Sequence, residues 1–183
     1  MRAFVALDVP GQVLDSLVSF GSELSATGAD LKLVERQNLH FTLKFLGEIT
    51  DGEAAEAQSK LSGLQMKGAT AEVRGVGAFP NARSPRVVWA GVAREQEAPL
   101  VQIAKEVIAV LEGIGERDDR PFQAHITLGR VRSFRNSGAL GDLLRENAGR
   151  SFGTAVLSEV KLKSSVLTPA GPIYKDIGAF PLK

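Results

Sequence analysis

LHFTLKFLG, residues 39–47, alternates between apolar and polar side chains, which is the pattern of a half-buried β-strand. The alternation places Phe41, Leu43 and Phe45 on one face, which we expect to pack into the core. His40, Thr42 and Lys44 fall on the other face, away from the core. The strand therefore presents a histidine beside a threonine on a surface that packing alone does not explain.

The same motif occurs a second time, where His125-Ile-Thr127-Leu repeats His40-Phe-Thr42-Leu. The chain has only two histidines, and each of them starts one of these motifs. The predicted elements around the motifs follow one another in the same order, β-α-β-α-β, in both halves. The first half has strands at 2–9, 39–46 and 70–79 and helices at 11–25 and 53–64; the second has strands at 87–93, 124–131 and 153–167 and helices at 98–112 and 138–147, before a last strand at 173–180.

This repeat predicts an α+β fold of two lobes, made by internal duplication and related by a pseudo-two-fold axis. We expect antiparallel sheets to line a central cleft, with the helices outside. The whole chain, 1–183, then forms one domain of two pseudo-symmetric lobes, with the motifs at 40–43 and 125–128. The equivalent strands face each other, so that both His-Thr pairs line the shared cleft.

Composition limits the other classes of protein. Hydrophobic residues make up 44% and charged residues 23% of the chain, which is ordinary for a globular domain. There is no cysteine, which excludes disulfides and Cys-ligated metal sites, and the net charge of +1 gives no global attraction to nucleic acid. Asp8 and Pro10 interrupt the N-terminal apolar stretch too early for a signal peptide. We expect a cytoplasmic monomer without membrane contact.

Two opposed His-Thr pairs suit an in-line displacement at phosphorus. A histidine titrates near neutrality, so one can act as a base while the other acts as an acid. The threonine hydroxyls of Thr42 and Thr127 can hold the non-bridging oxygens of the phosphate. No Asp, Glu or Cys stands at metal-ligand spacing, and the chain contains neither a G-x-S-x-G elbow nor a GxxxxGK[ST] loop. We therefore expect no cofactor and no metal.

These motifs resemble those of the 2H phosphoesterase superfamily, in particular its RNA 2′,3′-cyclic phosphodiesterase branch, historically called 2′-5′ RNA ligases. The resemblance covers nearly the whole chain, in the stretches RAFVALDVP (2–10), RQNLHFTLKFLGEI (36–49), GVGAFPNARSPRVVWAGV (75–92), FQAHITLGRVR (122–132) and LKSSVLTPAGPIYKDIGAFPL (162–182). It implies hydrolysis of RNA 2′,3′-cyclic phosphate termini to 2′-phosphates without ATP or metal, with reversible 2′-5′ RNA ligation left open. It also implies that His40 donates a proton to the leaving 3′ oxygen and that His125 activates water.

Arg130 follows the second motif, and strict alternation would place it on the core face with Ile126 and Leu128. A β-bulge at Gly129 would instead turn Arg130 toward the cleft, where the resemblance implies a phosphate-binding arginine. Other positions are open. Arginines in loops near the motifs can contact RNA or simply face solvent, and three aromatic residues can stack on a base, although core packing is favoured for Trp89. These residues are Arg83, Arg86, Arg132 and Arg135, and Phe122, Trp89 and Tyr174.

Three functions remain possible at this point. The expected partners are RNA 3′ ends or nucleotides that carry a 2′,3′-cyclic phosphate. One alternative is a cyclic phosphodiesterase that acts on small nucleotides such as an ADP-ribose cyclic phosphate. Another is a nucleotide-binding module without turnover, which the intact His and Thr in both halves argue against. The first two functions differ in whether the site continues into an extended groove or closes into a pocket.

Overall fold

The computed structural model describes residues 1–183, and its elements follow the predicted order closely. Two short 3-10 turns, Arg36–Asn38 and Arg94–Gln96, interrupt the series of strands and helices. In chain order the strands and α-helices are β1 (Arg2–Asp8), α1 (Gly11–Ala26), β2 (Leu31–Leu33), β3 (His40–Glu48), α2 (Asp51–Ser62), β4 (Ala69–Phe79), β5 (Val87–Val92), α3 (Ala98–Val110), β6 (Ile126–Val131), α4 (Ser137–Glu146), β7 (Ser151–Leu157), β8 (Glu159–Thr168) and β9 (Gly171–Pro181).

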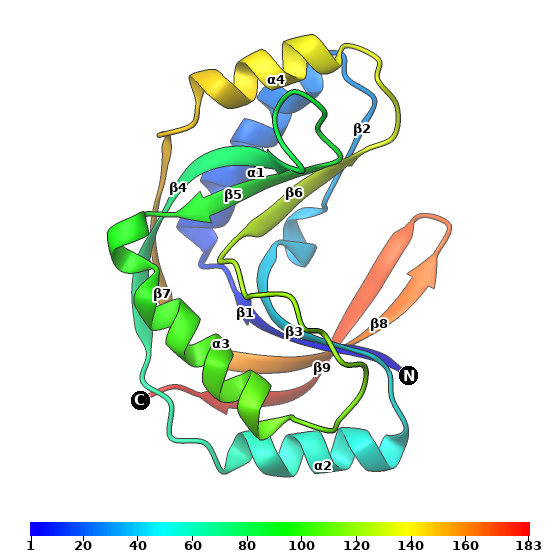
Figure 1. The fold of residues 1–183 in the computed structure, drawn as a ribbon, viewed down its shortest axis with the longest axis vertical. Coiled ribbons are helices and arrows are strands. Elements are labelled where there is room, and N and C mark those ends of the chain that lie inside the picture. Colours follow the sequence, from blue (N-terminus) through cyan, green and yellow to red (C-terminus); the bar gives the residue numbers. More distant parts are fainter.

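The strands form a single curled antiparallel sheet in the order β7-β4-β5-β6-β3-β1-β8-β9, with the short β2 beside β6. The order is symmetric about its centre, where β6 of the second half meets β3 of the first. On either side of this centre, β5 matches β1, because each of them opens its half of the chain. The predicted α+β architecture of two lobes is confirmed, with the refinement that the two sheets are continuous (Figure 1).

The helices cover the outer faces of the two lobes. Helix α1 packs on β7 and α4 on β4 in one lobe, while α3 packs on β3 and α2 on β9 in the other. Figure 1 shows α1 and α4 at one end of the molecule and α2 and α3 at the other, with the curled sheet between them. None of the helices has both the length and the apolar character that a membrane crossing requires.

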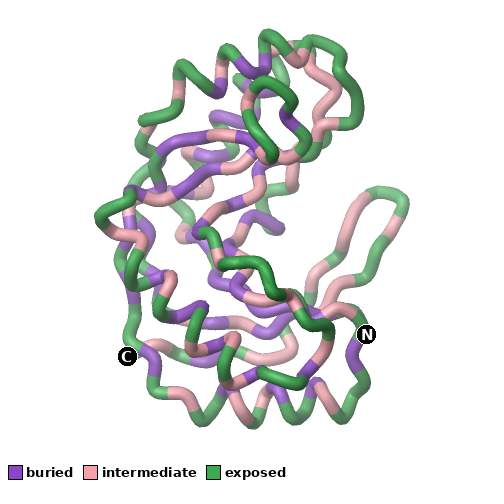
Figure 2. Tube along the Cα trace, in the orientation of Figure 1, coloured by how far each residue is buried: buried purple, intermediate pink, exposed green.

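Apolar residues between helices and sheet form one core cluster of 41 buried residues. Figure 2 shows buried segments along the middle of the strands and exposed segments along the outer faces of the helices. On β1 the cluster includes Ala3, Val5 and Leu7, which face the helices, and leaves out Phe4 and Ala6, which alternate with them. The concave face of the sheet is therefore separate from the core.

The long strand predicted at 153–167 is wrong, because the chain forms two strands there. Strand β7 pairs with β4 at one edge of the sheet, and β8 pairs with β1 in the other lobe. The change occurs at Ser158, which lies between them. Strand β4 of the first half therefore completes the lobe of β5 and β6, and β8 of the second half completes the lobe of β1 and β3. Periodicity along one segment does not reveal such a crossing.

The predicted core position of Phe45 is also wrong, since 47% of its surface is exposed. The register between β1 and β3 shifts before Phe45 is reached: Ala6 pairs with Thr42 but Val5 with Lys44, and Phe4 then pairs with Phe45. The shift leaves Leu43 as an extra residue in β3, and such a β-bulge reverses which face the following side chains take. Phe45 consequently joins His40 and Thr42 on the concave face. Lys44, predicted to share that face, is paired with the core-facing Val5 instead.

Candidate active site

Strands β3 and β6 pair as backbones at a single position, Phe41 opposite Ile126. Each of these residues directly follows a histidine, so the pairing brings both His-Thr motifs to the centre of the concave face. Because the strands are antiparallel, His40 lies toward Thr127 and His125 toward Thr42. The four side chains and Arg130 line one cavity of about 670 Å³. The predicted site residues are therefore brought together by the fold.

Both imidazoles are held in the same way. The Nδ1 atom of His40 lies 2.7 Å from the carbonyl oxygen of Asn38, and Nδ1 of His125 lies 2.8 Å from that of Gln123. A carbonyl oxygen only accepts, so Nδ1 carries the hydrogen and Nε2 is the atom left for chemistry. The preceding carbonyl thus fixes the tautomer of each histidine.

The two Nε2 atoms differ in their surroundings. Nε2 of His40 lies 2.9 Å from Oγ1 of Thr42, whereas Nε2 of His125 makes no hydrogen bond within the protein. In the neutral state Nε2 of His40 accepts from the Thr42 hydroxyl, and in the protonated state it donates to the same oxygen. His125 therefore has its lone pair free toward the cavity, while His40 has a partner in either state.

Aromatic side chains enclose His40 more than His125. Phe4 stacks on the His40 ring at 5.0 Å, and Tyr174 meets the same ring edge-on at 5.6 Å. Phe79 meets His125 edge-on at 5.1 Å. Burial is the main cause that lowers the pKa of His40 to about 4, and it also lowers the pKa of His125, helped by the charge of Arg130. Both imidazoles are neutral in the free protein at neutral pH.

Arg130 faces the cleft, as expected from a β-bulge in this part of β6. Val88 pairs with Gly129 and Trp89 with Thr127, so the extra residue of the bulge is Leu128. Arg130 is exposed and lines the cavity together with Lys32 and Arg2. This gives the rim a positive charge suited to phosphate. The loop arginines singled out by sequence, Arg83, Arg86, Arg132 and Arg135, do not line this cavity.

The three aromatic candidates take different places. Tyr174 lines the cavity, as do Phe4 and Phe45, which sequence analysis did not select. Phe122 packs against the core cluster. The predicted core role of Trp89 is wrong: it lies outside the core cluster, because its neighbours Val88 and Ala90 take the inward positions of β5. Residues 87–92, VVWAGV, contain no polar side chain, so the sequence does not show which face of the strand Trp89 takes.

A group of four charges near His40 was also missed. Nζ of Lys161 lies 2.7 Å from Asp8 and 2.8 Å from Asp176, and Nζ of Lys163 lies 2.9 and 2.8 Å from the same two carboxylates. Asp8 is the strand partner of His40, so the group stands next to the site. These salt bridges outweigh burial and lower the pKa of both carboxyls. No three His, Cys, Asp or Glu side chains come together in a metal-binding arrangement.

A two-lobed sheet that presents one His-Thr pair from each lobe to a single cationic cavity defines a 2H-type phosphoesterase fold and site. The family model of the LigT like Phosphoesterase matches residues 7–89 and 91–174. The chain belongs to this family, which confirms the resemblance found in its motifs.

Relatives are similar over the full length. The chain is 42% identical to the RNA 2′,3′-cyclic phosphodiesterase of Archaeoglobus fulgidus, covering 98% of this chain and 99% of that protein. It is 37% identical to the protein of the same name from Methanothermobacter thermautotrophicus, covering 100% and 99%.

Solved structures agree with this fold. A crystal structure of a Thermus thermophilus protein is 29% identical with a TM-score of 0.77, covering 100% of this chain and 98% of that one. Escherichia coli LigT in its apo form is 24% identical with a TM-score of 0.81, covering 100% and 97%, and supports the fold alone.

The lowered pKa of His40 predicts how stability depends on pH. Between the unfolded value of 6.5 and the folded value of about 4, the unfolded state binds more protons, so the free energy of unfolding falls as pH decreases through this range. The variant His40→Gln removes this contribution. We expect urea unfolding at a series of pH values to give a shallower decline for the variant than for the wild type. Carboxylates titrate in both proteins and cancel in the comparison, so parallel curves would contradict the lowered pKa.

Proposed function

We propose that the protein hydrolyses 2′,3′-cyclic phosphates at RNA ends to 2′-phosphates by general acid and base catalysis with its two histidines. The observation that carries the proposal is that one cationic cavity holds Nε2 of both imidazoles together with two threonine hydroxyls and Arg130. The names of the full-length relatives support RNA 2′,3′-cyclic phosphate as the substrate.

In the proposed reaction, water attacks phosphorus in line with the departing 3′ oxygen. Nε2 of His125 takes a proton from the water as the new P–O bond forms, and Nε2 of His40 gives a proton to the 3′ oxygen as the P–O3′ bond breaks. The phosphate stays on the 2′ oxygen. The free lone pair of His125 supports its role as base, and the nearby Arg130 disfavours its protonated form.

His40 must be protonated to act as the acid, although its pKa in the free protein is about 4. The bound substrate carries a negative charge between the imidazoles, which raises the pKa of both of them. Thr42 turns from donor to acceptor when His40 gains its proton, so the hydrogen bond between them is kept. Thr127 and Arg130 then carry most of the contact with the non-bridging oxygens.

The same geometry suits ligation, in which the nucleophile differs but the acid and base keep their roles. If an RNA 5′ hydroxyl takes the place of water at His125, the product is a 2′-5′ phosphodiester, and the 3′ oxygen leaves as before. The return reaction needs the opposite assignment of acid and base, with His40 taking the proton from the 3′ hydroxyl. Hydrolysis is favoured by the concentration of water, so ligation requires the 5′ end to be held in place.

The direct test is to incubate the protein with an oligoribonucleotide that ends in a 2′,3′-cyclic phosphate, in EDTA and without ATP. We expect the cyclic phosphate to open at the same rate as in buffer without EDTA. The product should be the 2′-phosphate, identified by chromatography against both isomers. A 3′-phosphate product would reverse the assigned leaving group. Loss of activity in EDTA that a divalent ion restores would overturn the mechanism.

The histidine variants His40→Ala and His125→Ala should each lower kcat by roughly two to four orders of magnitude, the usual contribution of a positioned acid or base. The wild-type rate should follow a bell-shaped pH profile, with both limbs set by the coupled pair. Circular dichroism and urea unfolding serve as controls for folding. A folded variant with nearly wild-type turnover would contradict two-histidine catalysis.

Replacing the phosphate-binding groups separates charge from geometry. Thr127→Val keeps the β-branched shape and removes the hydroxyl, and should lower kcat by roughly two orders of magnitude. Thr42→Val should in addition alter the limb of the pH profile that reports His40, because the two side chains are hydrogen-bonded. Full activity in both valine variants would limit the hydroxyls to a structural role.

Arg130→Lys keeps the charge and loses the planar fork, so a large defect indicates bidentate contact with phosphate.

A further inference from the structure

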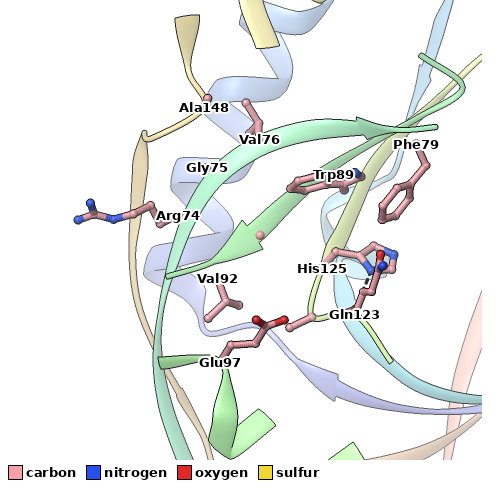
Figure 3. A pocket seen from close by; sticks show the side chains of 12 residues that line it. Arg74, Gly75, Val76, Phe79, Trp89, Val92, Glu97, Gln123, His125 and Ala148 are labelled. Atoms are coloured by element: carbon pink, nitrogen blue, oxygen red, sulfur yellow. Dashed lines mark hydrogen bonds between the residues drawn. The ribbon is translucent and has the colours of Figure 1, made fainter. Parts of the chain in front are cut away.

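A second cavity, of about 380 Å³, lies beside His125 (Figure 3). Strands β4 and β5 form its wall, and Glu97 before α3 and Gln123 before β6 close it. His125 lines both cavities, whereas His40 lines only the larger one. A ligand in the second cavity therefore lies beside His125.

Trp89 provides the flat surface of this cavity. It pairs with Gly77 on one side and with Thr127 on the other, so its side chain lies on the same face as the Thr127 hydroxyl. A Cβ added to Gly77 would lie 2.5 Å from Cζ2 of the indole, and one added to Gly91 would lie 3.2 Å from Cζ3. The indole thus lies over the two glycines, where any larger residue would displace it, and it lines the cavity.

A continuous series of aromatic rings connects this surface with the reacting centre. The rings of Phe79 and Trp89 are 5.4 Å apart and inclined by 36°, and Phe79 meets His125 edge-on at 5.1 Å. The indole Nε1 is buried and has no hydrogen-bond partner, so shape alone fixes its orientation. Figure 3 shows the side chains of Glu97 and Gln123 on the side of the cavity opposite the strands.

The charges around the cavity disfavour a phosphate as its ligand. Arg74 is already paired with Glu72 at 2.9 Å, and Glu97 adds a negative charge. A planar uncharged heterocycle fits better, because it can stack on Trp89 while Gln123 and Glu97 hydrogen-bond to its edge. The larger cavity, with its cationic rim and its own aromatic residues, remains available for the terminal nucleotide.

We propose that the cavity beside Trp89 is a subsite for a second nucleobase, distinct from the base of the terminal nucleotide. This inference rests on the proposed function. The second base has two possible sources with the same chemistry. It belongs either to the preceding nucleotide of the same strand or to the 5′-terminal nucleoside of a second strand, whose hydroxyl reaches His125 in place of water.

Binding can be measured without altering the subsite, because Trp89 is the only tryptophan of the chain. The variant His40→Ala should slow turnover strongly, and it leaves the residues of the second cavity unchanged. We expect a dinucleotide with a 2′,3′-cyclic phosphate, or a mononucleotide with an added dinucleoside bearing a free 5′ hydroxyl, to change indole fluorescence more than the cyclic mononucleotide alone. Equal changes with and without the second base would overturn the subsite.

Kinetics identify the source of the base. In Trp89→Ala we expect the ratio of kcat/KM for the cyclic dinucleotide to that for the cyclic mononucleotide to fall about ten- to a hundred-fold if the base comes from the same strand. If it comes from a second strand, the yield of 2′-5′ product falls by a similar factor relative to hydrolysis. Trp89→Phe should restore most of either loss, which separates stacking from misfolding.

The control variant Phe134→Ala removes an aromatic ring that is 75% exposed and lines neither cavity. It should leave both ratios unchanged. Opening of the cyclic mononucleotide by the wild type tests the proposed function separately, since it needs no second base. If the mononucleotide is opened and both ratios stay at their wild-type values in folded Trp89→Ala, the subsite is wrong and the proposed function stands.

Discussion

The single backbone contact between Phe41 and Ile126 is the constraint on which the site depends. Both side chains are completely buried, so the core fixes the two strands where they meet. Because His40 and His125 directly precede these residues, the contact sets the separation of the imidazoles without help from any loop. Their Nδ1 atoms are then held by the carbonyls of Asn38 and Gln123, which leaves little rotational freedom to the rings. Such preorganisation is what an acid-base pair requires.

Enclosure by aromatic rings disfavours the protonated form of both histidines, and the proposed reaction depends on this. Burial lowers the pKa of both histidines, so the imidazoles are uncharged before an anion binds and the positive charge of the cavity comes from its rim. The phosphate brings the charge that favours protonation, and the neighbours of each histidine decide where the proton goes. Arg130 opposes it at His125. At His40 the charge of Lys163 opposes protonation and that of Asp8 favours it, and Thr42 provides an acceptor for the proton.

Alternation and duplication predicted the elements, the two lobes and the cavity that joins His40, Thr42, His125 and Thr127. Arg130 was expected there from the resemblance, since strict alternation would have placed it on the core face. The predictions that were wrong concern positions where pairing with a neighbouring strand decides the structure. Phe45 follows a register shift against β1, which its own strand does not encode, and the strand predicted at 153–167 divides because its parts pair with different lobes. The charge group that includes Asp8 and Lys163 joins β1, β8 and β9, so no local pattern reveals it. Trp89 was misplaced because an aromatic residue in an apolar strand normally indicates core.

Duplication makes the reacting groups symmetric, but the proposed reaction has a direction, and the surroundings of the two motifs differ accordingly. The His40 side carries Phe4, Tyr174 and the β8–β9 hairpin around a cationic cavity that suits the ribose and its leaving oxygen. The His125 side carries Phe79 and Trp89, the latter over two glycines, which suits the planar group proposed to bind there. An exact two-fold site would bind either face of the substrate equally. The asymmetry therefore lies outside the motifs, in side chains that the duplication did not keep, and these side chains are the basis on which we propose the acid in one lobe and the base in the other.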